Sequence, residues 1–284
     1  MSLSNCVDEA VIIPPNQDKW TASKKFVTTR DGIQLAYVEW GKIGHNPVIL
    51  IHGYTDSSRA WSLIAPYLND RHFIAVDLRG HGNSEKTKDG FNLTSFAKDM
   101  CELLDALGIE KADFIGHSLG SMTSAAFAIY HANRVNRVIL VSTAVQPPGP
   151  MTDWLAQSIA SATFPLDADG KFLEEWSWNP HPVDPVFLKH LRREEAATPY
   201  ETWKGCLDAL EITNWAQAAR HIKSPTFVLW GDQDQLFGET EQQAVMAALP
   251  KAKFKTYKGY GHSMTWEIPD IVAGDIMMFL DGSN

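Results

Sequence analysis

The chain has 284 residues, of which 44% are hydrophobic, so it is long enough to bury a substantial core. It contains 25 Lys and Arg against 34 Asp and Glu, and the net charge of −9 argues against nucleic acid or acidic membranes as partners. No run of about 18 apolar residues is present, so the sequence predicts no membrane-spanning helix.

The N-terminal segment and the cysteines predict a cytoplasmic protein. Residues 1–20 lack the basic start, the long apolar stretch and the small-residue cleavage site of a secretory signal peptide. The cysteines are odd in number, widely spaced and without a C-x-x-C pair, so they do not indicate a disulfide framework. They are Cys6, Cys101 and Cys206. We therefore expect a reduced, cytoplasmic chain, and no pattern indicates its oligomeric state.

The first predicted elements are two strands, at residues 24–30 and 33–40, which the turn Asp31-Gly32 joins into a hairpin. Short apolar runs then predict strands that are buried on both faces, as in a parallel sheet covered by helices. These runs are residues 47–51, 72–78, 112–115, 138–142 and 226–230. Segments with helical spacing alternate with them, at residues 60–68, 93–107, 119–131 and 239–249. The alternation predicts an α/β fold with a mostly parallel sheet flanked by helices.

The segment from Val145 to Trp215 interrupts this alternation. It begins with the proline-rich run 147–150, shows no pattern of a buried strand, and contains helical pieces rich in tryptophan. We expect a helical cap inserted after the sixth strand. The predicted organisation is a first core part with an N-terminal arm at 1–145, a helical cap or lid at 146–215, and a second core part at 216–284.

A candidate nucleophile stands in the run Gly116-His117-Ser118-Leu119-Gly120, which follows a predicted strand and opens a predicted helix. A serine on such a tight turn exposes its hydroxyl at the edge of the sheet, and glycine fits the crowded positions two residues to either side. The N-terminus of the following helix favours a developing oxyanion. The simpler interpretation is an ordinary glycine-containing turn between a strand and a helix.

A serine hydroxyl is a weak nucleophile and needs a base that is itself oriented by an acid. The candidate base is His262, which follows the predicted strand 254–257. The candidate acids are Asp232 and Asp234, which follow the strand 226–230. Ser142 ends the sixth predicted strand without a carboxylate nearby, so that strand supplies no acid.

These motifs, in this order, resemble the α/β-hydrolase superfamily. The matching runs are His52–Ser58 with Trp61, Asp77–Ser84, Gly116–Gly120, Gly231–Asp234 and Gly261-His262. The resemblance covers the chain from Phe26 to its C-terminus, with the cap as the variable part, and implies the α/β-hydrolase fold.

The resemblance also implies roles for single residues. The acid of the family stands three residues after the glycine that closes its strand, which selects Asp234, so Asp232 is expected to be a turn residue or a solvated charge. The family binds the oxyanion with two backbone N–H groups, here those of Tyr54 and Leu119. His117 is expected to be a packing residue and His52 a brace of the oxyanion loop.

Several sequence features narrow the reaction. A serine at position 118 disfavours the dehalogenases and epoxide hydrolases of this fold, which use a carboxylate nucleophile. No H-E-x-x-H or H-x-H-x-D-H string and no phosphate-binding glycine motif is present, so we expect neither a metal nor another cofactor. The sequence predicts a metal-independent serine esterase or lactonase for a small, hydrophobic substrate. Carbon–carbon or amide hydrolysis, perhydrolysis, acyl transfer and a ligand receptor on the same fold remain alternatives.

The tryptophans of the predicted cap have two interpretations. They line a pocket that suits an acyl chain or an aromatic group, or they pack the small core of the cap itself. The residues concerned are Trp154, Trp176, Trp178 and Trp203.

Overall fold

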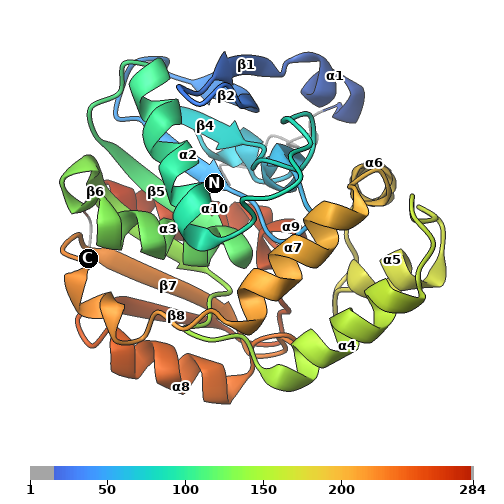
Figure 1. Cartoon of the computed structure of the whole chain (residues 1–284). Coiled ribbons are helices and arrows are strands. Elements are labelled where there is room, and N and C mark those ends of the chain that lie inside the picture. The colour runs from blue at the N-terminus through green and yellow to red at the C-terminus, as the bar shows by residue number, and fades with distance from the viewer. Residues whose placement is uncertain (1–15, 283–284) are drawn as a thin grey trace, which may run out of the picture.

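The computed structural model describes residues 16–282, and residues 1–15, which include Cys6, and 283–284 lie outside the described residues. The described chain forms an eight-stranded sheet in the order β1-β2-β4-β3-β5-β6-β7-β8 (Figure 1). The strands are β1 Lys25–Thr28, β2 Gln34–Gly41, β3 Val48–Ile51, β4 His72–Val76, β5 Ala112–His117, β6 Val135–Val141, β7 Thr226–Gly231 and β8 Lys253–Tyr257. β1, β2 and β4 pair antiparallel, and all other neighbours are parallel.

Helices cover both faces of the sheet because its central strands are apolar on both sides. One apolar core joins the sheet to α2, α3 and α8, and a second joins the opposite face to α10 and two short 3₁₀ turns. The bounds of these and the adjoining helices are α1 Gln17–Ala22, α2 Leu93–Ala106, α3 Leu119–Tyr130, α8 Glu239–Ala248, α9 Met264–Glu267 and α10 Pro269–Leu280. This layered arrangement confirms the predicted α/β fold with a mostly parallel sheet.

The single helix predicted at residues 60–68 is wrong. Two 3₁₀ helices, η1 Ser58–Trp61 and η2 Ala65–Tyr67, occupy this region instead. Pro66 is one cause, since proline has no N–H to donate and its ring clashes with the preceding helical turn. Two further 3₁₀ turns are η3 Ala132–Arg134 and η4 Ala218–His221.

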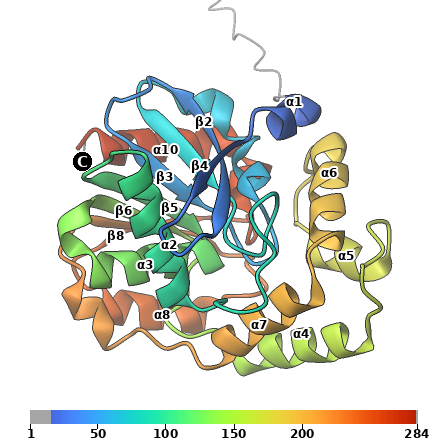
Figure 2. The ribbon, with the colours of Figure 1, turned by 45° about the horizontal axis from the view of Figure 1, so that its top comes forward.

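The segment between β6 and β7 contains helices throughout its regular parts. They are α4 Gly149–Ser161, α5 Lys171–Trp176, α6 Pro185–Ala196 and α7 Tyr200–Glu211. Figures 1 and 2 show these helices together at one side of the sheet, apart from the two layers that cover its faces. This is the segment that the sequence predicts as a cap.

One buried guanidinium ties this helical segment to the rest of the chain. Arg59, on η1, is 1% exposed, and its Nη1 donates to the carbonyl and the side-chain oxygen of Gln17 at 2.9 and 2.7 Å. Its Nη2 donates to Glu194 Oε1 of α6 at 2.6 Å and also to the hydroxyl of Thr21. Three separate chain segments therefore meet on the side chain of Arg59.

Two further findings concern the described residues as a whole. No helix among residues 16–282 is both long and apolar enough to cross a bilayer. Cys101 and Cys206 are free thiols.

Candidate active site

Ser118 lies on the sharp turn between β5 and α3, with φ at 53° and ψ at −118°. A β-carbon added to Gly116 would lie 2.1 Å from the carbonyl oxygen of Gly120, and one added to Gly120 would lie 2.1 Å from that of Ile51. Only glycine fits both positions, because the turn packs backbone against backbone. Since a positive φ is unfavourable for serine, the surrounding structure must impose this conformation.

Two backbone amides adjoin the serine. Leu119 follows it at the N-terminus of α3, where the N–H groups have no partner within the helix. Tyr54 lies on the loop after β3, which passes so close that a β-carbon on Gly53 would be 3.4 Å from Ser118 Cβ. In the part of the chain that the structure describes, neither amide N–H donates a hydrogen bond. Both are therefore free to bind an oxyanion.

His52 fixes the loop that carries Tyr54. Its Nε2 accepts a hydrogen bond from the amide of Leu78 at 3.0 Å, so the proton is on Nδ1, which donates to the carbonyl of Gly53 at 2.7 Å. Burial lowers the pKa of His52 to about 4, which keeps the ring neutral. The expected bracing of this loop agrees with these contacts.

His262 pairs with one of the two candidate acids. Its Nδ1 lies 2.8 Å from Oδ2 of Asp234, whose side chain is fully buried. The other oxygen of Asp234 accepts the backbone amides of Leu236 and Phe237 at 2.9 and 3.0 Å. The carboxylate is thus held in place at both oxygens.

Asp232 makes different contacts. Its Oδ1 accepts the amide of Gly259 at 2.6 Å and the side-chain amide of Gln233 at 3.2 Å. These contacts join two loops, and the structure does not bring Asp232 into contact with His262.

The backbone of His262 is held by two side chains. Its carbonyl accepts the hydroxyl of Ser142 at 2.6 Å and Nε2 of His117 at 3.0 Å. Burial is the main cause that lowers the pKa of His117 to about 3, so this ring is neutral. In the sequence, Ser142 only marks the end of a predicted strand that carries no acid. Its contact with the backbone of His262 could not be predicted, because a hydrogen bond from a hydroxyl to a distant carbonyl leaves no sequence pattern.

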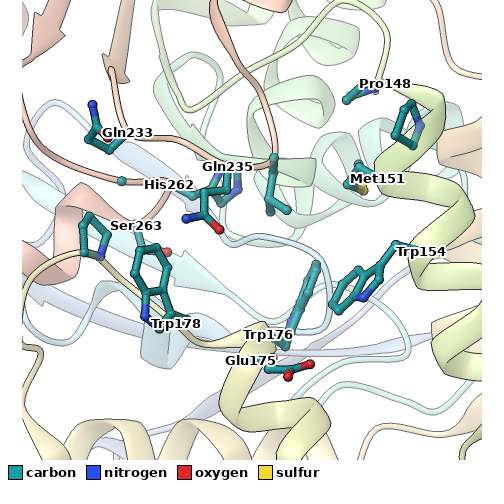
Figure 3. Close-up of a pocket in the computed structure, with 14 residues that line it drawn as sticks. Pro148, Met151, Trp154, Glu175, Trp176, Trp178, Gln233, Gln235, His262 and Ser263 are labelled. Carbon is teal, nitrogen blue, oxygen red and sulfur yellow. The ribbon is translucent and has the colours of Figure 1, made fainter.

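A cavity of about 430 Å³ opens in front of His262 (Figure 3). Trp154, Trp176 and Trp178 line it, and Figure 3 shows their side chains with that of His262 around the same space. Ser118 is not among its lining residues. It lines two smaller cavities of about 30 and 10 Å³.

Trp203 is placed differently from the other three tryptophans. It is fully buried and packs edge-on against Tyr54 and Trp176, with ring centroids 5.3 and 6.1 Å apart. It lines none of these three cavities. In contrast, Trp154 and Trp178 are 37% and 53% exposed.

The two small cavities differ in character. The one of about 10 Å³ is lined by aliphatic and aromatic residues apart from Ser118. The one of about 30 Å³ holds Ser118 and His262 together with two acids, Asp56 and Glu195. The site therefore has an apolar side and an acidic side, both next to Ser118.

Sequence analysis did not identify these two acids as site residues. Asp56 stands in the run His52–Ser58, where it was quoted without a role, and Glu195 ends the charged run Arg192–Glu195. Burial raises the pKa of Asp56 to about 7, and burial together with the charge of Asp56 raises that of Glu195 well above its usual range. Among the described residues, no cluster of three or more His, Cys, Asp or Glu is arranged to hold a metal ion.

Comparison with known proteins agrees with this geometry. Residues 46–269 match the family model of the α/β-hydrolase fold. The chain is 26% identical to the non-heme chloroperoxidase CPO-A1 of Kitasatospora aureofaciens over 84% of this chain and 91% of that protein. It is also 26% identical to the bifunctional esterase/perhydrolase DCH of Acinetobacter calcoaceticus over 90% of this chain and 99% of that protein.

A solved structure shows the same similarity. A hydrolase from Pseudomonas aeruginosa superposes with a TM-score of 0.80 at 25% identity, covering 92% of this chain and 98% of that one. Because the family match spans most of the chain and includes Ser118, Asp234 and His262, the protein belongs to the α/β-hydrolase fold family.

Proposed function

We propose that the protein is a serine hydrolase that cleaves a carboxylic ester or lactone through an acyl-enzyme on Ser118. The observation that carries the proposal is the hydrogen bond of 2.8 Å between His262 Nδ1 and Asp234, beside a cavity that His262 shares with Ser118. A base oriented by a buried carboxylate and adjacent to a serine is the arrangement that activates such a nucleophile.

Each group has a role in the proposed mechanism. His262 takes the proton of the Ser118 hydroxyl as the oxygen attacks the carbonyl carbon, and Asp234 stabilises the imidazolium that results. The amides of Tyr54 and Leu119 bind the oxyanion of the tetrahedral intermediate. His262 then returns the proton to the leaving alcohol, and water, activated by the same histidine, releases the acid from Ser118.

The shape of the site supports a hydrophobic substrate. We propose that the segment 146–215 acts as the cap, because it supplies Trp154, Trp176 and Trp178 to the cavity of about 430 Å³. A cavity that is mostly apolar with a few polar groups suits a small-molecule ligand. The relative from Acinetobacter calcoaceticus, named as an esterase and perhydrolase, supports an ester as the substrate.

The test uses aryl esters, aliphatic lactones and acyl-homoserine lactones, with a chelator present. We expect turnover of at least one class, and Ser118→Ala should lower kcat by about 10⁴-fold or more while circular dichroism stays unchanged. A fluorophosphonate probe should label Ser118, as mapped by mass spectrometry. An active Ser118→Ala variant, or labelling at Ser84 or Ser142, would overturn the assignment. A single stoichiometric release without turnover would indicate a receptor instead.

A further inference from the structure

Two acids from different parts of the chain face the cavity that contains Ser118 and His262. Asp56 lies on the loop after β3, and Glu195 lies in the last turn of α6. They are 5% and 1% exposed, and both line the cavity of about 30 Å³. This places two carboxyl groups directly beside the proposed nucleophile.

Both acids are held in place. A β-carbon added to Gly53 would lie 2.8 Å from Asp56 Oδ2 and 3.4 Å from Ser118 Cβ, so the carboxyl of Asp56 and the serine converge on one small region. On α6, the neighbouring Glu194 is tied to Arg59 at 2.6 Å. The backbone carbonyl of Glu195 also accepts Trp203 Nε1 at 3.4 Å. The backbone of α6 is therefore fixed where Glu195 lines the cavity.

The pair lacks a positively charged partner. Within residues 16–282, neither acid forms an ion pair with Lys or Arg, because Arg59 binds Glu194 and Arg192 Nε donates to the hydroxyl of Ser177 at 2.7 Å. Oε2 of Glu195 is buried and has no hydrogen-bond partner among these residues. The group nearest to Asp56 Oδ2 among the basic side chains is His117 Nδ1, which is neutral and 3.9 Å away.

Ionisation of both carboxyl groups in one buried cavity is unfavourable, because each charge is desolvated and the two charges repel each other. The titratable or charged groups around them are His262 and Glu194 near Asp56, and Arg192 and Glu194 near Glu195. Burial raises both pKa values, and repulsion from Asp56 adds to the rise for Glu195, so the uncharged form of each acid is favoured. A buried acceptor without a partner is unfavourable, so a ligand that satisfies it gains affinity.

We propose that Asp56 and Glu195 form a recognition subsite for a protonated primary amine on the substrate. An ammonium group supplies the missing positive charge and three N–H donors, which match the unpaired oxygen of Glu195 and the carboxyl of Asp56. The cavity of about 30 Å³ has room for about two water-sized groups, enough for an ammonium with its carbon. This inference rests on the proposed function, since it names the substrate class of the same site.

The amine can belong to the acyl part or to the alcohol part of the ester, and two matched pairs distinguish these sources. The first pair is the 4-nitrophenyl ester of β-alanine and 4-nitrophenyl butyrate, which differ by an ammonium in place of a methyl group. The second is 3-aminopropyl benzoate and butyl benzoate. The measured quantity is the ratio of kcat/KM within each pair near pH 7.

We expect the amine ester to be preferred in one of the two pairs. Glu195→Gln and Asp56→Asn should each lower that ratio by about 10- to 100-fold. A change of this size corresponds to the loss of one hydrogen bond to a charged group. The control is Glu174→Gln, which removes one negative charge from an exposed position on α5 and should leave the ratio unchanged. Using two variants guards against one that fails to fold, as judged by circular dichroism.

A second readout does not depend on turnover. Calorimetry on Ser118→Ala should show binding of n-propylammonium and none of 1-propanol. It should also show release of a proton near pH 7, seen as a heat that changes with the ionisation enthalpy of the buffer. Adding Glu195→Gln should abolish this binding.

The outcomes separate the two proposals. Turnover of neutral esters that depends on Ser118, without an amine preference in either pair, would overturn the subsite and leave the hydrolase intact. A preference that both acid variants retain would also overturn the subsite. Turnover that survives in Ser118→Ala would overturn the hydrolase mechanism instead.

Discussion

The carboxylate of Asp234 accepts a hydrogen bond from the imidazole of His262 over 2.8 Å, while its other oxygen accepts two backbone amides. This second set of contacts fixes the acid independently of the histidine. Nδ1 of His262 is therefore the ring nitrogen that donates to Asp234, and Nε2 takes no part in this contact.

Asp234→Asn should lower kcat by about 10³- to 10⁴-fold, because an amide can present its N–H to Nδ1 and stabilise the wrong tautomer of His262. Asp232→Asn should lose little activity, since Asp232 contacts only Gly259 and Gln233. Turnover of one soluble ester by both variants tests this ranking, with folding checked by circular dichroism. The reverse ranking would transfer the role of the acid to Asp232.

Two glycine substitutions should have opposite effects on the free energy of unfolding. Gly120→Ala should lower it by more than about 2 kcal/mol, because the new methyl group would meet the backbone oxygen of Ile51 at 2.1 Å. Gly274→Ala, within α10, should raise it by about 0.5–1 kcal/mol, because nothing lies within 4 Å and alanine favours a helix. Urea denaturation measures both, and a stable Gly120→Ala variant would contradict the tight turn.

The four tryptophans of the segment 146–215 should not respond alike to alanine substitution. Trp203→Ala should lose about 3–5 kcal/mol of stability, because its ring is fully buried. Trp154→Ala and Trp178→Ala should cost less stability, since both rings are partly exposed at the large cavity. At least one of these two should change the ratio of kcat/KM between a short and a long ester by about tenfold, or 1.4 kcal/mol.

Melting temperatures and the two kcat/KM values, measured for every variant, decide this prediction. If all of these changes lowered stability and activity together at a fixed ratio between the esters, the tryptophans would only pack the segment.

Stability should depend on pH through Asp56. Burial raises its pKa from 3.8 to about 7, so folding becomes less favourable as the pH rises through this range, and the penalty is complete above about pH 7. Asp56→Asn removes this penalty and also relieves the repulsion on Glu195. We compare the free energy of unfolding of the variant with that of the unmodified protein at two pH values. The difference in favour of the variant should be larger at pH 8 than at pH 4 by about 1–3 kcal/mol. Denaturation at both pH values measures it, and a difference that stays constant would contradict the raised pKa.

The elements that could be predicted from the sequence are those whose structure depends on neighbouring residues in the chain. The buried strands and the turn at Ser118 follow from apolar runs and from glycines that no other residue can replace. At residues 60–68 the apolar spacing predicts one helix, but Pro66 interrupts it and two 3₁₀ helices form instead. The catalytic roles of Ser118, Asp234 and His262 remain predictions that the proposed experiments test.

Contacts between distant segments could not be predicted from the sequence. Glu194 and Glu195 are adjacent on α6 and point about 100° apart. One reaches Arg59 and the other faces the cavity. Nothing in the run of charges distinguishes them, because burial depends on how the helix lies against the sheet. The same holds for Ser142, whose contact with His262 joins residues 120 positions apart.

The guanidinium of Arg59 determines how one side of the site is held to the rest of the chain. Its planar group donates to two segments at once, α1 through Gln17 and Thr21 and α6 through Glu194, which a lysine at this position could not do. It anchors the end of α6, whereas α4 and α5 carry Trp154 and Trp176 at the mouth of the large cavity. Trp176 Nε1 also donates to Thr55 Oγ1 at 3.2 Å, so α5 is tied to the loop after β3 as α6 is tied to η1. Loss of the Arg59 contact would therefore release the end of α6 that carries Glu195, whereas the contact of Trp176 with Thr55 would remain.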